Sequence, residues 1–180
     1  MSPLVIGIDP GKTGAAVALD LDGRPIEWIA ADHPSEGYVV KGSKARHYVP
    51  SCMALWLADL IGGEVASSRI RLAVIEKQST RPIEGRTSCL TTGIGFGLWV
   101  GILAALRVPY QIVPPATWTR GVFGSAPASG ERKARAIQTA RARLPELELT
   151  WGRKTKAHDG IADAGCMALH ALDMIGRGAA

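Results

Sequence analysis

The sequence predicts an α/β protein with one mixed five-stranded sheet, three antiparallel strands followed by two parallel ones, flanked by helices. Short apolar runs separated by tight turns open the chain, which is typical of an antiparallel meander. From residue 51 onward helical and strand patterns alternate, which favours right-handed crossovers and parallel strands. The chain has 180 residues, 47% of them hydrophobic, and shows no internal repeat or break in composition. We therefore expect one domain covering residues 1–180.

The first part of the chain predicts the antiparallel strands. Apolar runs at Leu4–Asp9, Ala15–Leu19 and Pro25–Ala30 each suit one strand, and Asp22-Gly23 supplies the turn between the last two. Residues 33–50 show no clear periodicity and contain Gly, Ser and Lys, so we expect a loop there.

The middle of the chain predicts the two parallel strands and two helices. Apolar residues recur on one side of Ser51–Ile61, which indicates a helix. Ile70–Glu76 and Tyr110–Val113 are short apolar runs that predict strands. The stretch between them, Thr87–Arg107, predicts a long helix that crosses from one strand to the next.

The last third predicts three more helices. Pro114-Pro115 marks the start of a short helix, because proline is tolerated in the first turn. A Gly-, Ser-, Ala- and Pro-rich connection at Phe123–Gly130 precedes a helix at Glu131–Leu144. After a basic loop at Pro145–Lys156, the final helix is expected to run from about His158 to Ile175.

Positive charge is concentrated in one region of the sequence. The chain carries 21 basic and 16 acidic side chains, a net charge of +5. Between Pro115 and Ala157 nine residues are basic and three are acidic, whereas the rest of the chain is close to neutral. A regional excess of this kind indicates a surface that meets phosphates. A solvated basic helix and loop is the alternative.

The cysteines and the N-terminus indicate a reduced, cytoplasmic protein. Cys52, Cys89 and Cys166 are odd in number and far apart, with no CxxC or Cys/His pattern, so neither a zinc site nor a disulfide framework is predicted. Asp9 interrupts the first apolar run, so no targeting segment is predicted. The uncharged stretch from Thr87 to Leu106 is long enough to span a bilayer. Because a buried helix has the same pattern, we expect no membrane contact.

Four acidic residues stand where a metal-dependent hydrolase would need them. Asp9 and Glu76 each end an apolar strand, and Asp159 and Asp163, four residues apart, share one face of the last predicted helix. Oxygen ligands suit Mg²⁺, and four carboxylates can hold two ions about 3.5–4 Å apart. Such a pair activates water and stabilises the leaving oxygen in phosphodiester cleavage. We therefore predict that these four residues are the metal ligands and catalytic groups, with two Mg²⁺ per site and Mn²⁺ as a substitute.

Each of these acids also has a purely structural interpretation. Asp9 could cap the turn that follows it. Glu76 could pair with Lys77 or Arg81, and Asp159 could cap the last helix. The fourth acid is hardest to explain in this way, because apolar residues surround it in the sequence.

Three motifs resemble the RuvC family of Holliday junction resolvases. GIDPGKTGAAVALD at Gly7–Asp20 resembles the opening hairpin of that family, and AVIEKQ at Ala73–Gln78 resembles its second acidic strand. HDGIADAGCMALHAL at His158–Leu172 resembles its closing acidic helix. The resemblance continues through VPPATW from Val113 and the helix that contains Lys133, so it covers nearly the whole chain. The DHP, KGSKAR and VPSCMALWL segments and the DGIADA form resemble the phage-type branch.

The resemblance implies an RNase H-like fold and a homodimer with one active site per subunit. Each site would nick one of two symmetric strands of a four-way DNA junction and leave 5′-phosphate and 3′-hydroxyl ends. The four acids named above occupy the positions of the family's metal ligands. Some members place the last two acids three residues apart, and some use a histidine. Here Gly160 stands three residues before Asp163, so the resemblance implies Asp159 as the partner, with His158 as an accessory candidate.

The resemblance also suggests roles for basic residues and glycines. Lys133 is a second accessory candidate, and a set of basic residues is expected to bind DNA: Arg132, Arg135, Arg153, Lys154 and Lys156. Gly93, Gly97 and Gly101 form a ridge of small residues that would let another helix approach closely. In the family the equivalent helix lies at the dimer interface. The alternative is that this ridge packs on the sheet of its own subunit.

Three rival functions remain. GIDPGKTGAA also resembles the phosphate-binding hairpin of sugar kinases and actin-like ATPases, but those proteins enclose ATP between two such domains, and no GxxxxGK motif is present. An RNase H-fold nuclease acting on RNA or on replication flaps is a closer rival. A binding module without activity is the third, and the four acids argue against it. The sequence therefore favours an endonuclease that resolves Holliday junctions or other branched DNA.

Overall fold

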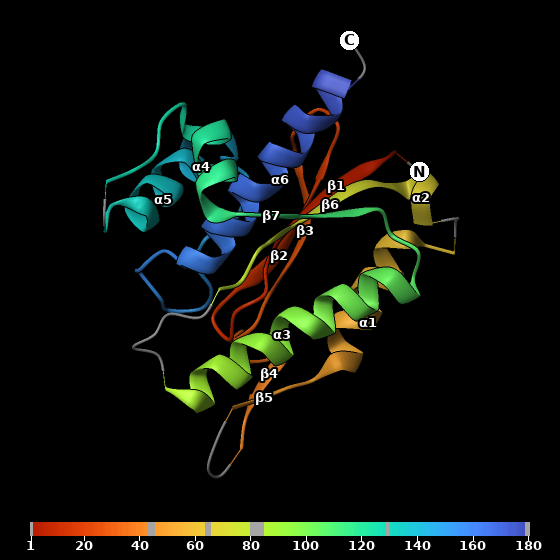
Figure 1. The fold of residues 1–180 in the computed structure, drawn as a ribbon, viewed down its shortest axis with the longest axis vertical. Coiled ribbons are helices and arrows are strands. Elements are labelled where there is room, and N and C mark those ends of the chain that lie inside the picture. The colour runs from red at the N-terminus through yellow and green to blue at the C-terminus, as the bar shows by residue number, and fades with distance from the viewer. Residues whose placement is uncertain (1, 43–45, 64–65, 80–84, 129, 179–180) are drawn as a thin grey trace.

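The structure is a computed structural model that describes residues 2–42, 46–63, 66–79, 85–128 and 130–178. Its centre is a five-stranded sheet in the order β3-β2-β1-β6-β7 (Figure 1). These strands are β1 (Leu4–Asp9), β2 (Ala15–Asp20), β3 (Pro25–Ala30), β6 (Ile70–Glu76) and β7 (Tyr110–Val113). The first three strands pair antiparallel, while β6 runs parallel to β1 and to β7. The predicted mixed sheet is confirmed.

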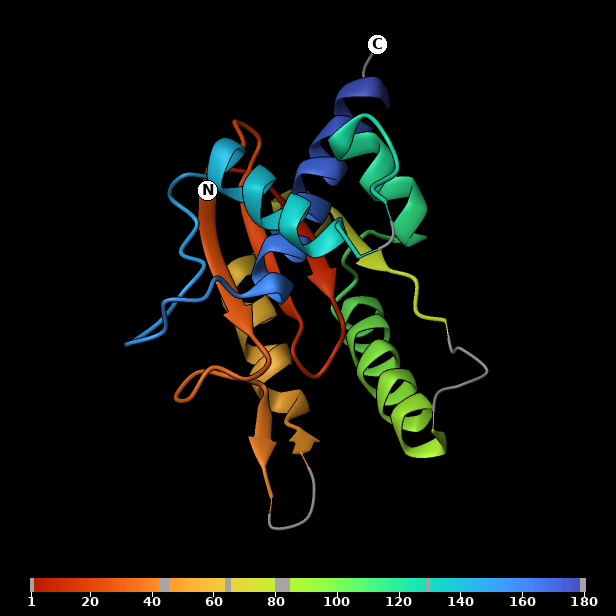
Figure 2. The ribbon, with the colours of Figure 1, turned by 90° about the vertical axis from the view of Figure 1, so that its left-hand side faces the viewer.

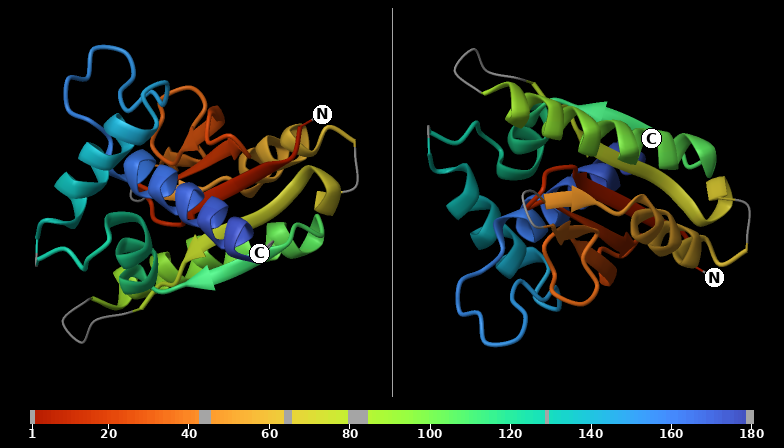
Figure 3. Two further views of the ribbon diagram at one scale, coloured as in Figure 1. Left: turned by 90° about the horizontal axis from the view of Figure 1, so that it is seen from above. Right: turned by 90° about the horizontal axis from the view of Figure 1, so that it is seen from below.

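Two groups of helices cover the sheet. On one face lie α4 (Pro115–Phe123), α5 (Arg132–Arg143) and α6 (Asp159–Gly178), which share a hydrophobic core with the strands. On the other face α1 (Pro50–Ile61) and α3 (Arg86–Ala105) enclose a second core. Figures 1 and 3 show α6 running along the strands, with α5 beside it and α3 in the other group.

Alternation along β1 explains why the sheet has a core on both faces. Leu4, Ile6 and Ile8 are buried on the face of α1 and α3, and Val5 is buried on the face of α6. Gly7 points the same way as Val5, and a Cβ there would come within 2.0 Å of the Ala164 carbonyl oxygen in α6. Only glycine therefore lets α6 lie this close to the central strand.

Two short elements differ from the prediction. Residues 33–50 were expected to form a loop, but β4 (Val39–Lys41) and β5 (Arg46–Tyr48) pair there as an antiparallel hairpin beside α1 and α3 (Figure 2). Tyr38, just before β4, is buried and packs edge-on against Trp99 of α3, with ring centroids 5.5 Å apart. The short helix α2 (Ala66–Arg69) was also not predicted. Each element is too short to produce a readable period.

One described helix, α3, is long and apolar enough to cross a membrane by length and composition alone. In this fold it lies along the sheet, and Gly95, Trp99 and Leu103 are buried in the core. The helix packs through this one side and is otherwise largely exposed, so it is only partly the buried helix that the sequence suggested.

Candidate active site

The four predicted acids come from β1, β6 and α6. These elements meet at the edge of the sheet formed by the carboxyl ends of the two central parallel strands. Gly7 of β1 pairs with Val74 of β6, and Asp9 and Glu76 each follow two residues later. Because side chains alternate along a strand, both carboxylates point to the face covered by α6. Asp163 precedes Ala164, whose carbonyl faces Gly7. The close approach of α6 to Gly7 therefore also fixes where the acids of α6 lie along β1.

Asp9 combines a turn contact with an electrostatic role. Its Oδ1 accepts a hydrogen bond from the Gly11 amide at 3.1 Å, so the predicted turn contact exists. Burial raises the pKa of Asp9 from its ordinary value to about 6, and repulsion from Glu76 adds to this shift. Capping the turn therefore does not remove Asp9 from the acidic cluster.

Glu76 is held by three donors. The Trp118 indole donates to its Oε1 at 3.0 Å, and the Arg132 guanidinium contacts the same oxygen at 2.7 Å. Gln78 donates to Oε2 at 3.3 Å. Among the described residues Glu76 has its ion pair with Arg132, whereas the sequence had suggested Lys77 or Arg81; Arg81 lies outside the described residues.

Asp163 is the most enclosed of the four acids. It is 3% exposed, its Oδ2 lies 3.3 Å from the Arg132 guanidinium, and its Oδ1 is buried without a hydrogen-bond partner among the described residues. Burial raises the pKa of Asp163 to about 8; Arg132 opposes this shift, and the neighbouring carboxylates reinforce it. A buried carboxylate oxygen without a donor is expensive, which makes this the place where a cation would contribute most.

Asp159 stands at the outer end of the cluster. It forms an ion pair with Lys133 of α5. Burial alone would raise the pKa of Asp159, but the Lys133 ammonium outweighs it and lowers that pKa below the ordinary value. The pKa of Lys133 is raised, chiefly by the hydrogen bond that its ammonium donates to the Asp159 carboxylate.

His158 caps α6. Its Nδ1 accepts from the Ile161 amide at 3.1 Å, and its Nε2 lies 2.8 Å from Asp32 Oδ1. The first contact makes Nδ1 the acceptor, which assigns the ring proton to Nε2 and directs it at Asp32. The capping contact that the sequence suggested for Asp159 is thus made by His158. Together with Trp118 and Gln78, Asp32 is a partner that the sequence analysis did not single out.

The predicted DNA-binding residues fall into two groups. Arg132 points into the acidic cluster, and Arg135 donates to the Phe123 carbonyl at 3.0 Å. Arg153 and Lys156 are exposed on the basic loop before α6. Lys154 in the same loop is also exposed, and its ammonium lies 3.8 Å from the centroid of the Trp151 ring. The role of all five residues in binding DNA stays a prediction.

The predicted glycine ridge faces away from its own sheet. Gly93, Gly97 and Gly101 are exposed, and a Cβ at any of them would meet no atom within 4 Å. Gly95 instead makes the close contact, because a Cβ there would lie 2.3 Å from the Tyr48 hydroxyl and 2.5 Å from the Pro10 carbonyl. The alternative in which the ridge packs inside one subunit therefore finds no support.

The acidic cluster fits divalent metal ions by the chemistry of its ligands. It offers hard carboxylate oxygens, and one of them is buried without a donor. Among the described residues no three acidic, histidine or cysteine side chains already stand in a metal-holding arrangement. Arg132 and Lys133 contact three of the four acids instead. The ligand set is therefore present, with protein cations at its centre.

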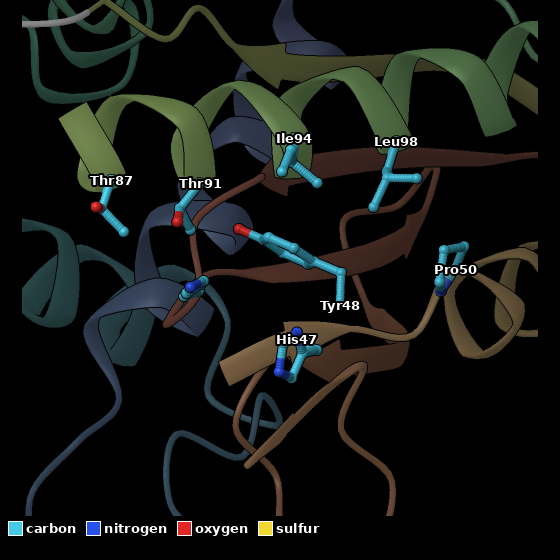
Figure 4. Close-up of a pocket in the computed structure, with 8 residues that line it drawn as sticks. His47, Tyr48, Pro50, Thr87, Thr91, Ile94 and Leu98 are labelled. Atoms are coloured by element: carbon cyan, nitrogen blue, oxygen red, sulfur yellow. The ribbon is translucent and has the colours of Figure 1, made fainter. Parts of the chain in front are cut away.

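A cleft adjoins this edge of the sheet. It measures about 450 Å³ and lies between β5 and α3, with Lys12, Tyr48, Thr91 and Ile94 among the residues that line it (Figure 4). None of the described residues that line it is acidic. The Tyr48 hydroxyl donates to the Pro10 carbonyl at 3.3 Å, so this Tyr48 cleft begins at the loop that follows Asp9.

Comparisons with known proteins agree with this fold. No protein-family model and no curated protein matches the sequence. The chain is similar to the structure of T. thermophilus RuvC in complex with Holliday junction substrate, with a TM-score of 0.64 and 18% identity over 97% of this chain and 96% of that one. It is also similar to a second Thermus thermophilus RuvC structure, with a TM-score of 0.58 and 22% identity over 96% of both chains. The RuvC-like, RNase H-like fold predicted from the sequence is confirmed; the phage-type branch stays a prediction.

Proposed function

We propose that this protein is an endonuclease that resolves Holliday junctions or other branched DNA by metal-dependent phosphodiester hydrolysis, acting as a homodimer. The observation that carries the proposal is the convergence of Asp9, Glu76, Asp159 and Asp163 at one edge of the sheet, beside the cations of α5. The matching fold has been captured on a Holliday junction in the T. thermophilus protein, which makes branched DNA the substrate to test first.

In this proposal the four carboxylates hold two Mg²⁺ ions, with Mn²⁺ as a substitute. Bound there, the ions would supply the activation of a water molecule and the neutralisation of charge on the leaving oxygen. The chain itself fixes its ligands before the substrate arrives. Trp118 and Gln78 orient the two oxygens of Glu76, and the His158 cap fixes the start of the helix that carries the other pair.

DNA would reach the site across the positive surface and the cleft. Lys133 lies at the outer end of the cluster, where its ammonium can stabilise charge on the phosphate. Lys12 and Thr91 line the Tyr48 cleft, and the absence of acids among the described lining residues suits a phosphodiester strand. An exposed basic loop supplies further backbone contacts.

The exposed glycine ridge on α3 supports the homodimer. A four-way junction is resolved cleanly by two matched nicks, and a two-fold dimer places one site over each of two opposing strands. Helix α3 leaves Leu90 66% exposed and Ile94 46% exposed beside the ridge. A second copy of α3 would cover this surface.

Cleavage of a panel of end-labelled substrates tests the function. A four-way junction, a flap, a duplex and an RNA–DNA hybrid are incubated with wild type and with Asp9→Asn, in Mg²⁺ and in excess EDTA. We expect paired symmetric nicks in the junction with 5′-phosphate ends, no cutting in EDTA, and none by the folded Asp9→Asn variant. Preferential cutting of the hybrid or the flap would assign the site to the rival nuclease class. Full activity in EDTA would end the metal mechanism.

A further inference from the structure

The first turn of α5 inserts a cation into the acidic cluster. One nitrogen of the Arg132 guanidinium lies 2.7 Å from Glu76 Oε1, and the other lies 3.3 Å from Asp163 Oδ2. The guanidinium carbon is 5.8 Å from the centroid of the Trp118 ring. Arg132 therefore bridges an acid at the end of β6 to one on α6, at the position between two proposed metal ligands.

This arrangement differs from an ordinary surface ion pair. Asp163 is almost fully buried, while 32% of the Arg132 side chain is exposed. The arginine thus reaches inward from a half-exposed position to neutralise carboxylates that have little access to water. Without a cation, the like charges of Glu76, Asp163 and Asp9 would face one another in a poorly solvated space, which is costly.

We propose that Arg132 is the resident counter-cation of the metal-free site. It competes with divalent ions for Glu76 and Asp163, and once displaced it binds a phosphate of the DNA. This inference rests on the proposed nuclease function. It explains why the described carboxylates surround protein cations rather than form an open metal-holding arrangement.

Displacement requires only a change of side-chain rotamer. Arginine has a long flexible stem, and its partly exposed position leaves room on the solvent side. A divalent ion brings twice the charge of a guanidinium to the same oxygens. The planar guanidinium, with five donors, also matches a phosphate as well as it matches a carboxylate. The observed contacts of Arg132 with the acids and its predicted contact with a phosphate then belong to two states of one residue.

Mg²⁺ binding without DNA tests the competition directly. Isothermal titration at pH 9, where proton release interferes least, compares wild type with Arg132→Gln, Arg132→Lys and the control Arg135→Gln. Arg135 lies one turn further along α5 and donates to a backbone carbonyl, so its loss leaves the acids untouched. We expect Arg132→Gln to bind Mg²⁺ roughly tenfold or more tightly, from removal of one unit charge close to the ions. The Mg²⁺ affinity of Arg132→Lys should lie between those of wild type and Arg132→Gln, because an ammonium cannot bridge both carboxylates in the same way.

DNA binding in Ca²⁺ provides the second measurement. If displaced Arg132 contacts a phosphate, the log–log salt slope of junction binding by Arg132→Gln should be smaller than that of wild type by about one unit. Circular dichroism checks the fold of each variant. If Arg132→Gln fails to fold, Arg132→Lys is compared with wild type in its place.

The outcomes separate the inference from the function. If wild type binds Mg²⁺ and Arg132→Gln binds it with the same affinity or more weakly, the competition is refuted while the metal mechanism stands. If an unchanged salt slope accompanies tighter metal binding, the phosphate half of the inference is refuted. If neither wild type nor Arg132→Gln binds Mg²⁺, the metal-dependent function and the inference fall together.

Discussion

Helices α3 and α6 are each 20 residues long and rich in glycine and apolar residues, yet their surroundings differ. In α6 every residue from Gly160 to Ala171 is buried, whereas α3 buries only Gly95, Trp99 and Leu103. The difference lies in what covers each helix. Helix α6 packs against β1, β2, β3, β6, α4 and α5. On α3, a Cβ at Gly93, Gly97 or Gly101 would meet no atom of the described residues within 4 Å. Helix α6 is thus covered by its own chain and carries the proposed chemistry, whereas α3 carries the exposed surface on which the proposed dimer would form.

Two glycines, Gly7 in β1 facing α6 and Gly97 in α3, show the same contrast. A Cβ at Gly7, facing α6, would collide with backbone atoms of Ala164 and Ala168 at 2.0 and 2.3 Å. A Cβ at Gly97 of α3 would meet nothing within 4 Å. In the first case glycine is required by close packing of two backbones, and in the second the space beside the glycine is open.

The largest expected effect comes from exchanging these two glycines for alanine. Gly7→Ala must push α6 off the sheet, so we expect a loss of about 3 kcal/mol or more in the free energy of unfolding. Gly97→Ala at low protein concentration should be neutral or more stable by up to about 1 kcal/mol, because alanine favours an exposed helix. Urea denaturation measures both. Equal effects of the two substitutions would remove the contrast between the helices.

A second, slightly smaller effect concerns the pH dependence of stability. The pKa of Asp9 is raised to about 6 and that of Asp163 to about 8, so the folded protein holds protons that the unfolded chain releases. This stabilisation is complete below about pH 4 and is lost as pH rises through 6 and then 8. The Tm of the metal-free protein should therefore fall between pH 5 and 9, by the equivalent of a few kcal/mol.

One variant and one ligand test sharpen this pH prediction. Asp163→Asn should remove most of the decline above pH 6, and Mg²⁺ should raise Tm more at pH 9 than at pH 5. A Tm of the metal-free wild type that rises across this range would contradict the prediction.

The next effect is on assembly. Gly97→Leu places a bulky side chain on the glycine ridge, and overpacking of this kind costs about 1–3 kcal/mol per site, counted twice in a two-fold dimer. Sedimentation should show a shift toward monomer with an unchanged circular dichroism spectrum. Junction cutting should become weak or confined to one strand. Paired nicks made by a wild-type protein that sediments as a monomer, both alone and on a junction, would rule out the dimer.

The smallest effect is expected from the exposed basic loop before α6. Replacing Arg153, Lys154 and Lys156 with alanine should weaken junction binding and reduce the log–log salt slope by roughly two to three units. Stability should change little, since all three side chains are exposed. Filter binding between 50 and 200 mM salt gives the slope. An unchanged slope would place the DNA-binding face elsewhere.

Much of the fold was predictable because its signals are local. The strands at residues 4–9, 25–30, 70–76 and 110–113 have the predicted limits, since each is an apolar run bounded by turn or helix residues. The β4–β5 hairpin was missed because three residues per strand do not establish an alternation. Its pairing depends on the long-range packing of Tyr38 against α3.

The acidic cluster was predictable in part for a related reason. Acids at the ends of two adjacent parallel strands must lie side by side, and a four-residue spacing places two more on one helix face. Most partners of these acids are set by tertiary contacts between residues far apart in the sequence, such as Trp118 with Glu76 across 42 positions. The contact of Asp32 with His158, beside the cluster, spans 126 positions. Nothing local marks them. For the same reason Arg132 gave no sign in the sequence that it points inward.

The position of α6 at the end of the described chain has a consequence for synthesis. Two of the four acids belong to α6, which leaves the ribosome after all five strands of the sheet. The acids of α6 meet the other two where α6 packs closely on Gly7 of β1, beside the β1–β6 pair, so a partial chain without α6 cannot assemble the cluster. If the proposed nuclease function holds, a nascent or prematurely terminated copy without α6 would lack two of the four ligands, so it could not damage the nucleic acid around it.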